Sequence, residues 1–116
     1  MHIKEHEEHC LRVLGSSFTE IHEWIDQYYG VINNVSHRVV LHHQYGIELG
    51  ISLFGEPARK ALELHVVDDF EFIPDTPEDV AQMMRDQDFL TPSETDILIQ
   101  LIRTNWPDML DQWNSL

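Results

Sequence analysis

Residues 35–54 read VSHRVVLHHQYGIELGISLF, and this stretch decides the fold class. One row of side chains recurs at intervals of four and three residues, along Val35, Val39, His42, Gly46, Leu49 and Leu53. Such intervals place side chains on one face of an α-helix. We therefore predict a single long helix over residues 35–54, with His42 in the seam that faces the core.

Two glycines four residues apart, Gly46 and Gly50, lie within this stretch. Each weakens a helix by about 1 kcal/mol relative to alanine. We expect the close approach of a neighbouring backbone, or of a bound group, to compensate for this loss.

Helix-start and helix-stop signals flank the stretch towards the N-terminus. Residues 3–14 form a first predicted helix, with Leu11 and Leu14 on its apolar face and Gly15 at its end. Ser17 and Glu20 have the spacing of a capping box and predict the start of a second helix, with Phe18, Ile21, Ile25 and Tyr28 on its apolar face. Gly30 or Asn33-Asn34 is the expected end of that helix.

Further helices are predicted after the stretch. Pro57 suits the first turn of a helix that continues to Asp69, and residues 70–74 form an extended connection. Thr76-Pro77 and Thr91-Pro92 each combine a cap with a proline at the first helical position. Trp106-Pro107 ends the last long helix, before a short turn that carries Leu110 and Trp113.

Alternation of period two is nearly absent from the chain, so no substantial sheet is expected. We predict an all-α fold, a compact bundle of about five to six helices. Its length suits one domain over residues 1–116. Within it, residues 1–70 form a histidine-bearing bundle and residues 75–116 an acidic helical hairpin.

The charge of the chain narrows the classes of partner. Seven basic residues against 21 acidic ones give a net charge of −14. Direct binding to a nucleic acid is disfavoured, because it needs clustered lysine and arginine. An acidic surface suits solubility, cations or a basic protein partner.

Compartment signals point to the cytoplasm. No apolar run approaches the roughly 18 residues of a membrane span, and the charged first nine residues are unlike a secretory signal. The single cysteine, Cys10, can make no internal disulfide, which fits a reducing compartment. We expect Cys10 to be a small core residue, with a thiolate ligand as the alternative.

Eight histidines all fall within residues 1–65, and this distribution indicates a shared site. Three of them, His22, His42 and His65, occupy inward positions on three predicted helices. For any one of them a core histidine bonded to a carbonyl is the simpler interpretation. Burying several imidazoles requires a partner for each, however, and one metal ion would serve all three.

Carboxylates accompany two of these histidines at helical spacing. Asp26 follows His22 by four residues, and Asp69 follows His65 by four. Each aspartate can be a direct ligand or can accept the other ring N–H of its histidine. The predicted metal-ligating residues are therefore His9, His22, His42, His65, Asp69 and Asp26, with His9 as the candidate for a fourth histidine.

Two histidines stay outside this set. On a helix His43 points about 100° away from His42, so only one of the pair is expected in the site. His37 suits a cap or an orienting contact better than ligation.

Histidine and carboxylate ligands suit a divalent metal, with Zn²⁺ first and Fe²⁺, Mn²⁺ or Ni²⁺ as alternatives. A site closed by protein ligands would be structural, whereas an open position would allow a metal-bound water and hydrolysis. The sequence leaves this choice open. It contains no H-E-x-x-H motif, no glycine-rich phosphate loop and no nucleophile elbow.

The polar residues also resemble a known family over roughly residues 6–77. The match consists of an early histidine at His9, an H-x-W-x-D motif, His-Arg and His-His pairs, Gly-Ile, Phe-Gly, an E-x-H-x-x-x-D motif and Ile-Pro. In this sequence these motifs are His22, Trp24 and Asp26, His37-Arg38, His42-His43, Gly46-Ile47, Phe54-Gly55, Glu63, His65 and Asp69, and Ile73-Pro74. The chain is similar to a group of small bacterial and phage proteins classed as a domain of unknown function. That resemblance implies that the polar residues act as one constellation, and it implies no reaction.

Charge and resemblance together suggest a function. From Glu63 to Asp96 there are eleven acidic residues and one base, Arg85. We expect a phage or mobile-element binding module with a structural metal. It would dock on a basic, nucleic-acid-binding partner in the host cytoplasm, as an anti-CRISPR inhibitor of a defence nuclease does. A solvated helix face is the simpler interpretation of the acidic run, and a metal-dependent hydrolase is the alternative function.

Overall fold

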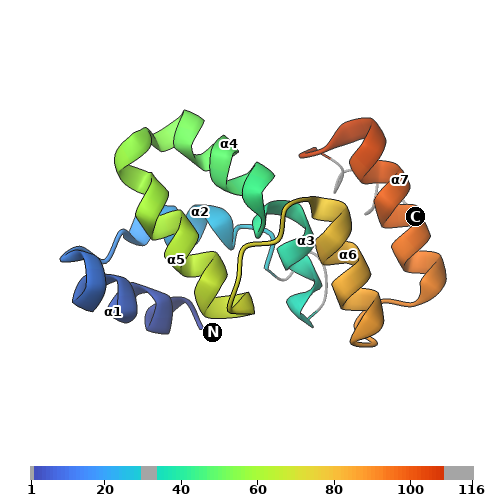
Figure 1. Ribbon diagram of the computed structural model, residues 1–116, viewed down its shortest axis with the longest axis horizontal. Helices are drawn as coiled ribbons and strands as arrows, with labels where there is room; N and C mark the ends of the chain where they lie inside the picture. Colours follow the sequence, from blue (N-terminus) through green and yellow to red (C-terminus); the bar gives the residue numbers. More distant parts are fainter. Residues whose placement is uncertain (1, 30–33, 109–116) are drawn as a thin grey trace.

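The computed structural model describes residues 2–29 and 34–108 (Figure 1). Within these ranges the protein is all-α, as predicted, and contains no β-strand. The α-helices are α1 (Ile3–Leu14), α2 (Thr19–Ile25), α3 (Arg38–Leu41), α4 (Gln44–Phe54), α5 (Arg59–Phe70), α6 (Pro77–Asp86) and α7 (Pro92–Asn105). Two 3₁₀ turns, η1 (Asn34–His37) and η2 (Glu56–Ala58), precede α3 and α5. The molecule measures 43 × 26 × 23 Å.

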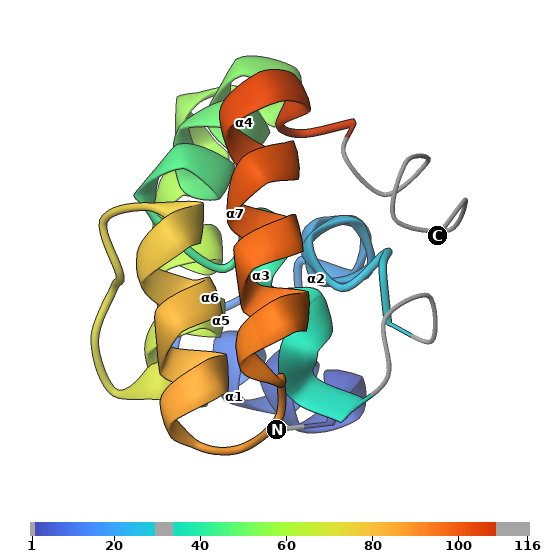
Figure 2. The same ribbon diagram turned by 90° about the vertical axis from the view of Figure 1, so that its right-hand side faces the viewer.

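Helix α5 organises the half of the molecule that contains the N-terminus, because α1, α2 and α4 all pack against it (Figure 1). Helices α6 and α7 lie side by side as a hairpin at the other end (Figure 2). Helix α3 lies between the two halves and packs against both α4 and α6. The indole Nε1 of Trp106 donates to the carbonyl of Val40 at 2.7 Å, which ties the end of α7 to α3.

The core is aliphatic on the hairpin side and mixed on the α5 side. Val80, Met84 and Leu98 are fully buried between the hairpin and α3. On the α5 side the buried histidines His6, His22, His42 and His65 accompany Cys10, Ile25 and Leu62. Burial, together with the charge of Asp68, raises the pKa of the Cys10 thiol. Cys10 therefore has the neutral, apolar character expected of a core residue.

Several predicted helix ends are confirmed. Helix α1 ends at Gly15, whose φ of 81° is the left-handed conformation that glycine adopts at low cost. Thr76 caps α6 by accepting from the backbone N–H of Asp79, and Thr91 forms a complete capping box with Glu94. The two prolines occupy the first turns of α6 and α7, as expected.

The prediction of one helix over residues 35–54 is wrong, because the chain breaks at His42 and His43. His43 is fully extended, and its Nδ1 accepts from the backbone N–H of Gly46 at 3.1 Å, so it starts a new helix as an N-cap. A side chain at Gly46 would collide with the carbonyl of Leu41, where α4 turns back close to α3. The predicted close approach at this glycine is thus confirmed, and it accompanies a helix break.

The predicted capping box at Ser17 is also absent. Helix α2 begins at Thr19 after Phe18, which has a left-handed φ of 48° and makes no side-chain cap. The Ser17 hydroxyl instead contacts the hydroxyl of Thr19 at 3.2 Å. The predicted ends at Gly30 and Asn33, and the turn with Leu110 and Trp113, lie outside the described residues.

No helix in the described ranges is long and apolar enough to cross a lipid bilayer.

Candidate metal centre

Four side chains from three parts of the fold converge at one place in the core. Asp26 is the C-terminal cap of α2, His42 lies at the break between α3 and α4, and His65 and Asp69 lie one turn apart on α5. Each offers one donor atom, and the four donor atoms lie within 4.8 Å of one another. Both imidazoles are fully buried, Asp69 is 2% exposed and Asp26 is 15% exposed.

The distances between these donor atoms match those of ligands around one ion. Nε2 of His42 lies 3.1 Å from Oδ1 of Asp26 and 3.2 Å from Oδ2 of Asp69. Nε2 of His65 lies 3.2 Å and 3.6 Å from the same two atoms. Ligands held at about 2.0–2.2 Å, at tetrahedral or octahedral angles, lie about 2.8–3.6 Å apart.

The contacts of His42 are close but poorly directed for hydrogen bonds. Its Nε2 is within 3.2 Å of two carboxylates without a well-aligned hydrogen bond to either, and its Nδ1 has no hydrogen-bond partner. A fully buried imidazole with such incomplete hydrogen bonding is costly. Its plane is inclined by 62° to that of His65, so the lone pairs of the two rings can meet at one point. The residues present therefore fit a divalent metal ion.

The electrostatics of the group keep the carboxylates ionised. Burial raises the pKa of Asp26, but contacts with His37, His42 and His65 outweigh it and hold that pKa far below its usual range. Burial also opposes ionisation of Asp69, whose pKa is nevertheless lowered by His42, His6 and Arg38. Two charged aspartates in a buried pocket are a strong attraction for a cation.

The pKa values of the two histidines in the group are shifted in opposite directions. Burial lowers the pKa of His42, but Asp26 and Asp69 more than reverse this effect and raise it above the usual value. Burial lowers the pKa of His65 to about 4, and Asp26 opposes this shift only in part. Without a metal, His42 therefore carries the proton that an incoming cation must displace.

Two further side chains surround the group. The guanidinium of Arg38 lies 3.2 Å from Oδ1 of Asp69, the oxygen that does not face His42, and stacks over Phe70. Nε2 of His37 lies 3.4 Å from Oδ1 of Asp26. Arg38 thus orients Asp69, and His37 has the orienting position that its sequence context suggested.

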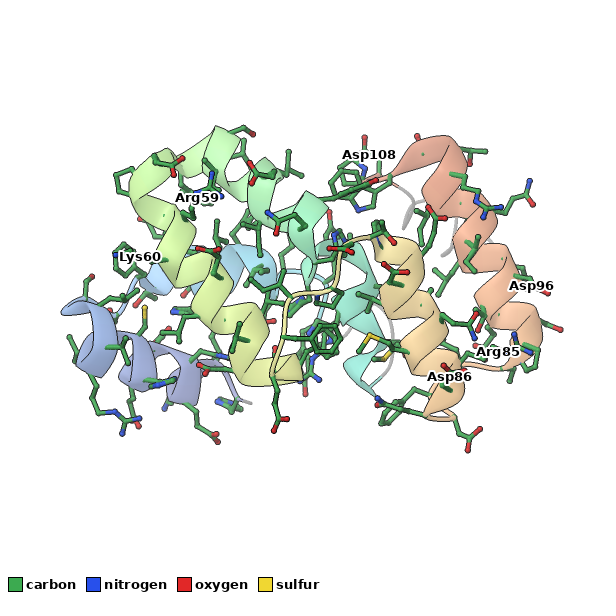
Figure 3. All side chains as sticks on the ribbon, viewed as in Figure 1. Arg59, Lys60, Arg85, Asp86, Asp96 and Asp108 are labelled. Atoms are coloured by element: carbon green, nitrogen blue, oxygen red, sulfur yellow. The ribbon has the colours of Figure 1, made fainter. Side chains whose placement is uncertain are left out.

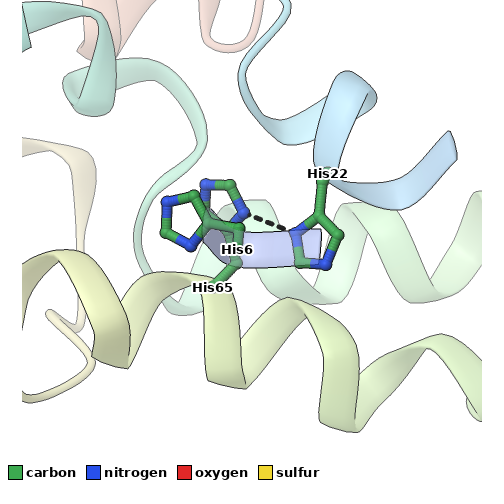
Figure 4. A group of neighbouring side chains, drawn as sticks. All are labelled: His6, His22 and His65. Carbon is green, nitrogen blue, oxygen red and sulfur yellow. Dashed lines mark hydrogen bonds between the residues drawn. The ribbon is translucent and has the colours of Figure 1, made fainter. Parts of the chain in front are cut away.

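A second group of histidines adjoins the first and shares His65 with it. Nδ1 of His65 lies 2.7 Å from Nδ1 of His22, at hydrogen-bonding distance (Figure 4). The ring of His6 stacks on the ring of His65, with centroids 3.6 Å apart. All three rings are fully buried, and ring nitrogens of the three lie within 4.8 Å of one another.

The ring planes distinguish this stacked group from the first. The planes of His6, His22 and His65 lie within 15° to 29° of parallel. A metal binds imidazole in the plane of the ring, so nearly parallel stacked rings direct their lone pairs side by side. The stacked group therefore suits mutual packing and hydrogen bonding, and the Asp26, His42, His65 and Asp69 group suits an ion.

The structure brings together four of the six residues predicted to bind metal: Asp26, His42, His65 and Asp69. His22 contacts this set through Nδ1 of His65. His9 lies outside both groups, where its Nδ1 is 2.8 Å from Oδ2 of Asp68, and its ligation stays a prediction. The ring nitrogens of His43 contact backbone, at Gly46 and at the carbonyls of Val39 and Val40, and its ring packs beside Tyr45 and Trp106.

Sequence reasoning missed His6, which is fully buried where His9 is 28% exposed. The predicted face of the first helix was carried by Leu11 and Leu14, yet Leu11 is 54% exposed. A stripe of Ile3, His6, Cys10 and Leu14, spaced three, four and four, would have identified the correct face.

Comparison with known families matches residues 1–90 to a domain of unknown function, DUF6915. The chain belongs to this family. The match spans α1 to α6 and includes every residue of both histidine groups, whereas α7 lies beyond it. Searches of curated proteins and of solved structures found no match.

Proposed function

We propose that this member of the family is a metal-binding helical protein whose ion is held by Asp26, His42, His65 and Asp69. One observation carries the proposal: four donor atoms from separate segments lie at ligand spacing among buried side chains, with no well-aligned hydrogen bond at His42. Zinc is the first candidate, because two imidazoles and two carboxylates satisfy its four-coordinate preference. Iron, manganese and nickel accept the same donors.

The ion would serve mainly to hold the fold together. Asp26, His42 and His65 come from segments far apart in sequence, so one ion cross-links α2, the α3–α4 junction and α5. It would also neutralise two buried carboxylates that otherwise repel each other. A metal bound in the fold and not in the unfolded chain adds its binding free energy to stability.

Metal analysis of the purified protein tests this proposal. We expect about one divalent ion per chain, and a melting temperature that falls when a chelator removes the ion. Absence of stoichiometric metal after growth and purification with zinc, iron, manganese or nickel would contradict the proposal, as would a melt unchanged by chelation.

We also propose that the acidic hairpin docks on a basic, nucleic-acid-binding partner, in the manner of an anti-CRISPR inhibitor. Support comes from carboxylates that face solvent along α6 and α7, including Asp86 and Asp96 (Figure 3). Arg103 pairs with Glu78 at 3.4 Å, and Arg85 is exposed beside Asp86 (Figure 3). Such a field speeds association with a cationic surface and weakens with salt.

Binding to a purified CRISPR nuclease, measured at low and high salt, tests the docking. The matched variant replaces Asp79, Asp86 and Asp96 by asparagine, which keeps shape and removes charge. We expect salt-sensitive binding and nuclease inhibition that this variant loses. Lack of binding at low salt, for representatives of the main nuclease types, would contradict the proposal.

A metal-dependent hydrolase is the second candidate function. One observation favours it: Asp26 reaches solvent at 15% exposure, so a water could approach the ion on that side. Metal-loaded protein assayed on phosphodiester and phosphomonoester substrates tests it. Hydrolysis that disappears in Asp26→Asn would support this function, and no turnover with any of the four metals would contradict it.

A further inference from the structure

His65 uses both of its ring nitrogens. Nε2 faces the carboxylates of Asp26 and Asp69, and Nδ1 faces Nδ1 of His22 at 2.7 Å. Imidazole can bind a metal only through a nitrogen that carries no proton. If Nε2 of His65 binds the ion, its remaining proton therefore lies on Nδ1, directed at His22.

The contact between His22 and His65 has two possible arrangements of protons. In one, Nδ1–H of His65 donates to Nδ1 of His22, and Nε2 of His65 is free to bind a metal. In the other, Nδ1–H of His22 donates to His65, whose proton then lies on Nε2 and points at Asp26, 3.2 Å away. Only the first arrangement binds an ion, so His22 is placed to decide the tautomer of His65.

The ring of His6 restrains His65 from a different side. It lies face to face on His65 at 3.6 Å, within 15° of parallel (Figure 4). Its Nε2 also lies 3.2 Å from Oδ1 of Asp69, so His6 contacts the metal centre through this carboxylate as well as through the face of His65. His65 is thus held on its face by His6 and at its edge by His22.

We propose that His22 is a positioning residue that accepts the Nδ1–H of His65 and so presents Nε2 of His65 to the metal. The inference rests on the metal centre proposed above and assigns a role to a histidine that is not needed as a ligand. Direct ligation by His22 fits the structure less well. Its Nδ1 is closer to Nδ1 of His65 than two ligands of one ion are expected to be, and the two rings are inclined by only 29°.

Two substitutions test whether His22 acts as a hydrogen-bond acceptor for His65 or as a metal ligand. In His22→Asn the side-chain amide oxygen can take the position of Nδ1 and still accept from His65. In His22→Leu the volume is similar and no acceptor remains. His9→Asn, at a partly exposed histidine on α1 that contacts neither group, is the matched control.

Zinc affinity is measured by competition with a chromophoric chelator, for the full-length wild type and the three variants. Loss of an outer hydrogen bond to a ligand weakens metal binding by about 10- to 100-fold. We expect a loss of that size in His22→Leu, a loss of about threefold or less in His22→Asn, and none in His9→Asn. The Co²⁺ absorption spectrum should keep the wild-type shape in all variants, because no ligand is removed.

Long-range ¹H–¹⁵N spectra of the zinc-loaded wild type give a readout that does not depend on any variant. We expect a proton on Nδ1 of His65 and metal on its Nε2. Metal on Nδ1 of either His65 or His22 would overturn the inference, even if His22→Leu fails to fold. A second zinc ion per chain that is lost in His22→Leu, or equal affinity in His22→Leu and wild type, would do the same.

These outcomes are separable from the proposed function. A wild type that binds no metal overturns both proposals. A wild type that binds one ion, with His22→Leu binding it equally tightly, overturns the role of His22 alone.

Discussion

The two histidine groups that meet at His65 contain similar residues and differ in geometry. In the stacked group of His6, His22 and His65 the rings lie nearly parallel, at 15° to 29°. In the Asp26, His42, His65 and Asp69 group the two rings are inclined by 62° and face two carboxylates. Counting histidines does not locate a metal site, because the direction of the ring planes decides which group can share an ion.

The largest effect is expected from a substitution at Asp26, whose Oδ1 is the most contacted atom of the Asp26, His42, His65 and Asp69 group. Oδ1 of Asp26 lies within 3.4 Å of Nε2 of His37, His42 and His65. We expect Asp26→Asn to lower zinc affinity by about a thousandfold, which corresponds to about 4 kcal/mol. Competition titration measures it.

The counterpart in the stacked group is His6→Asn. It should lower zinc affinity by about tenfold or less, because it removes a stacked ring and a contact with Asp69, but no ligand. Circular dichroism and the apo melting temperature control for folding in both variants. Equal losses in the two variants would show that the groups form one larger site.

Metal removal is expected to have a smaller effect than Asp26→Asn. An ion present at about a hundred times its dissociation constant stabilises the fold by about 2.7 kcal/mol. For a domain of this size we expect the melting temperature to fall by roughly 10 °C on chelation. Scanning calorimetry with and without chelator measures this, and Asp26→Asn, already without its ion, should show no further change.

A pH titration of the apo protein compares the adjacent residues His42 and His43, whose pKa values are shifted in opposite directions. His43 touches neither carboxylate, and burial lowers its pKa to about 4, against 6.5 for an ordinary histidine. The unfolded chain therefore binds this proton first, and the fold loses stability as pH falls from about 6.5 to about 4. The loss from His43 is about 3 kcal/mol at its fullest. Urea unfolding across this window measures the combined loss, to which His22 and His65 also contribute because their pKa values are lowered to about 4.

The neighbouring His42 has a raised pKa and behaves in the opposite way. Its protonated form is favoured in the fold, so its contribution to apo stability is complete below pH 6.5 and is lost as pH rises through the raised pKa. A metal competes with that proton, so zinc affinity should fall with decreasing pH from above 6.5. A zinc affinity independent of pH between 8 and 6 would count against His42 as a ligand.

The smallest effect is expected at His9. It is partly exposed and pairs with Asp68, and such contacts contribute about 1 kcal/mol or less. We expect His9→Ala to keep its zinc and to melt within a few degrees of the wild type. Loss of the ion in this variant would restore His9 as a ligand.

Much of the fold was predictable because local signals agreed with tertiary packing. Thr76, Thr91 and Gly15 mark helix ends by side-chain acceptors or by a left-handed φ, which depend on adjacent residues only. The break at His42 was not predictable from periodicity. The apolar spacing continues through it, and the interruption depends on the contact of Gly46 with the Leu41 backbone.

The sequence predicted which types of residue form the candidate site, but it predicted less well which individual residues belong to it. The spacing of His65 and Asp69 placed both on one face of α5, where the structure has them. Asp26, by contrast, joins the group with His42 and His65 at the end of α2, while its sequence neighbour His22 turns to the stacked group. Which face of α1 is buried depended on packing against α5, so His6 was missed in favour of His9.

The requirement for glycine at position 46 has a consequence for the search for related metal centres in other genomes. The break puts His42 and His43, adjacent in sequence, into different surroundings, and only a residue without a Cβ allows the chain to turn there. A search for chains that build the same centre should therefore weight a glycine three residues after a histidine pair as heavily as the histidines. Sequences that keep both histidines and replace that glycine are expected to have lost the geometry.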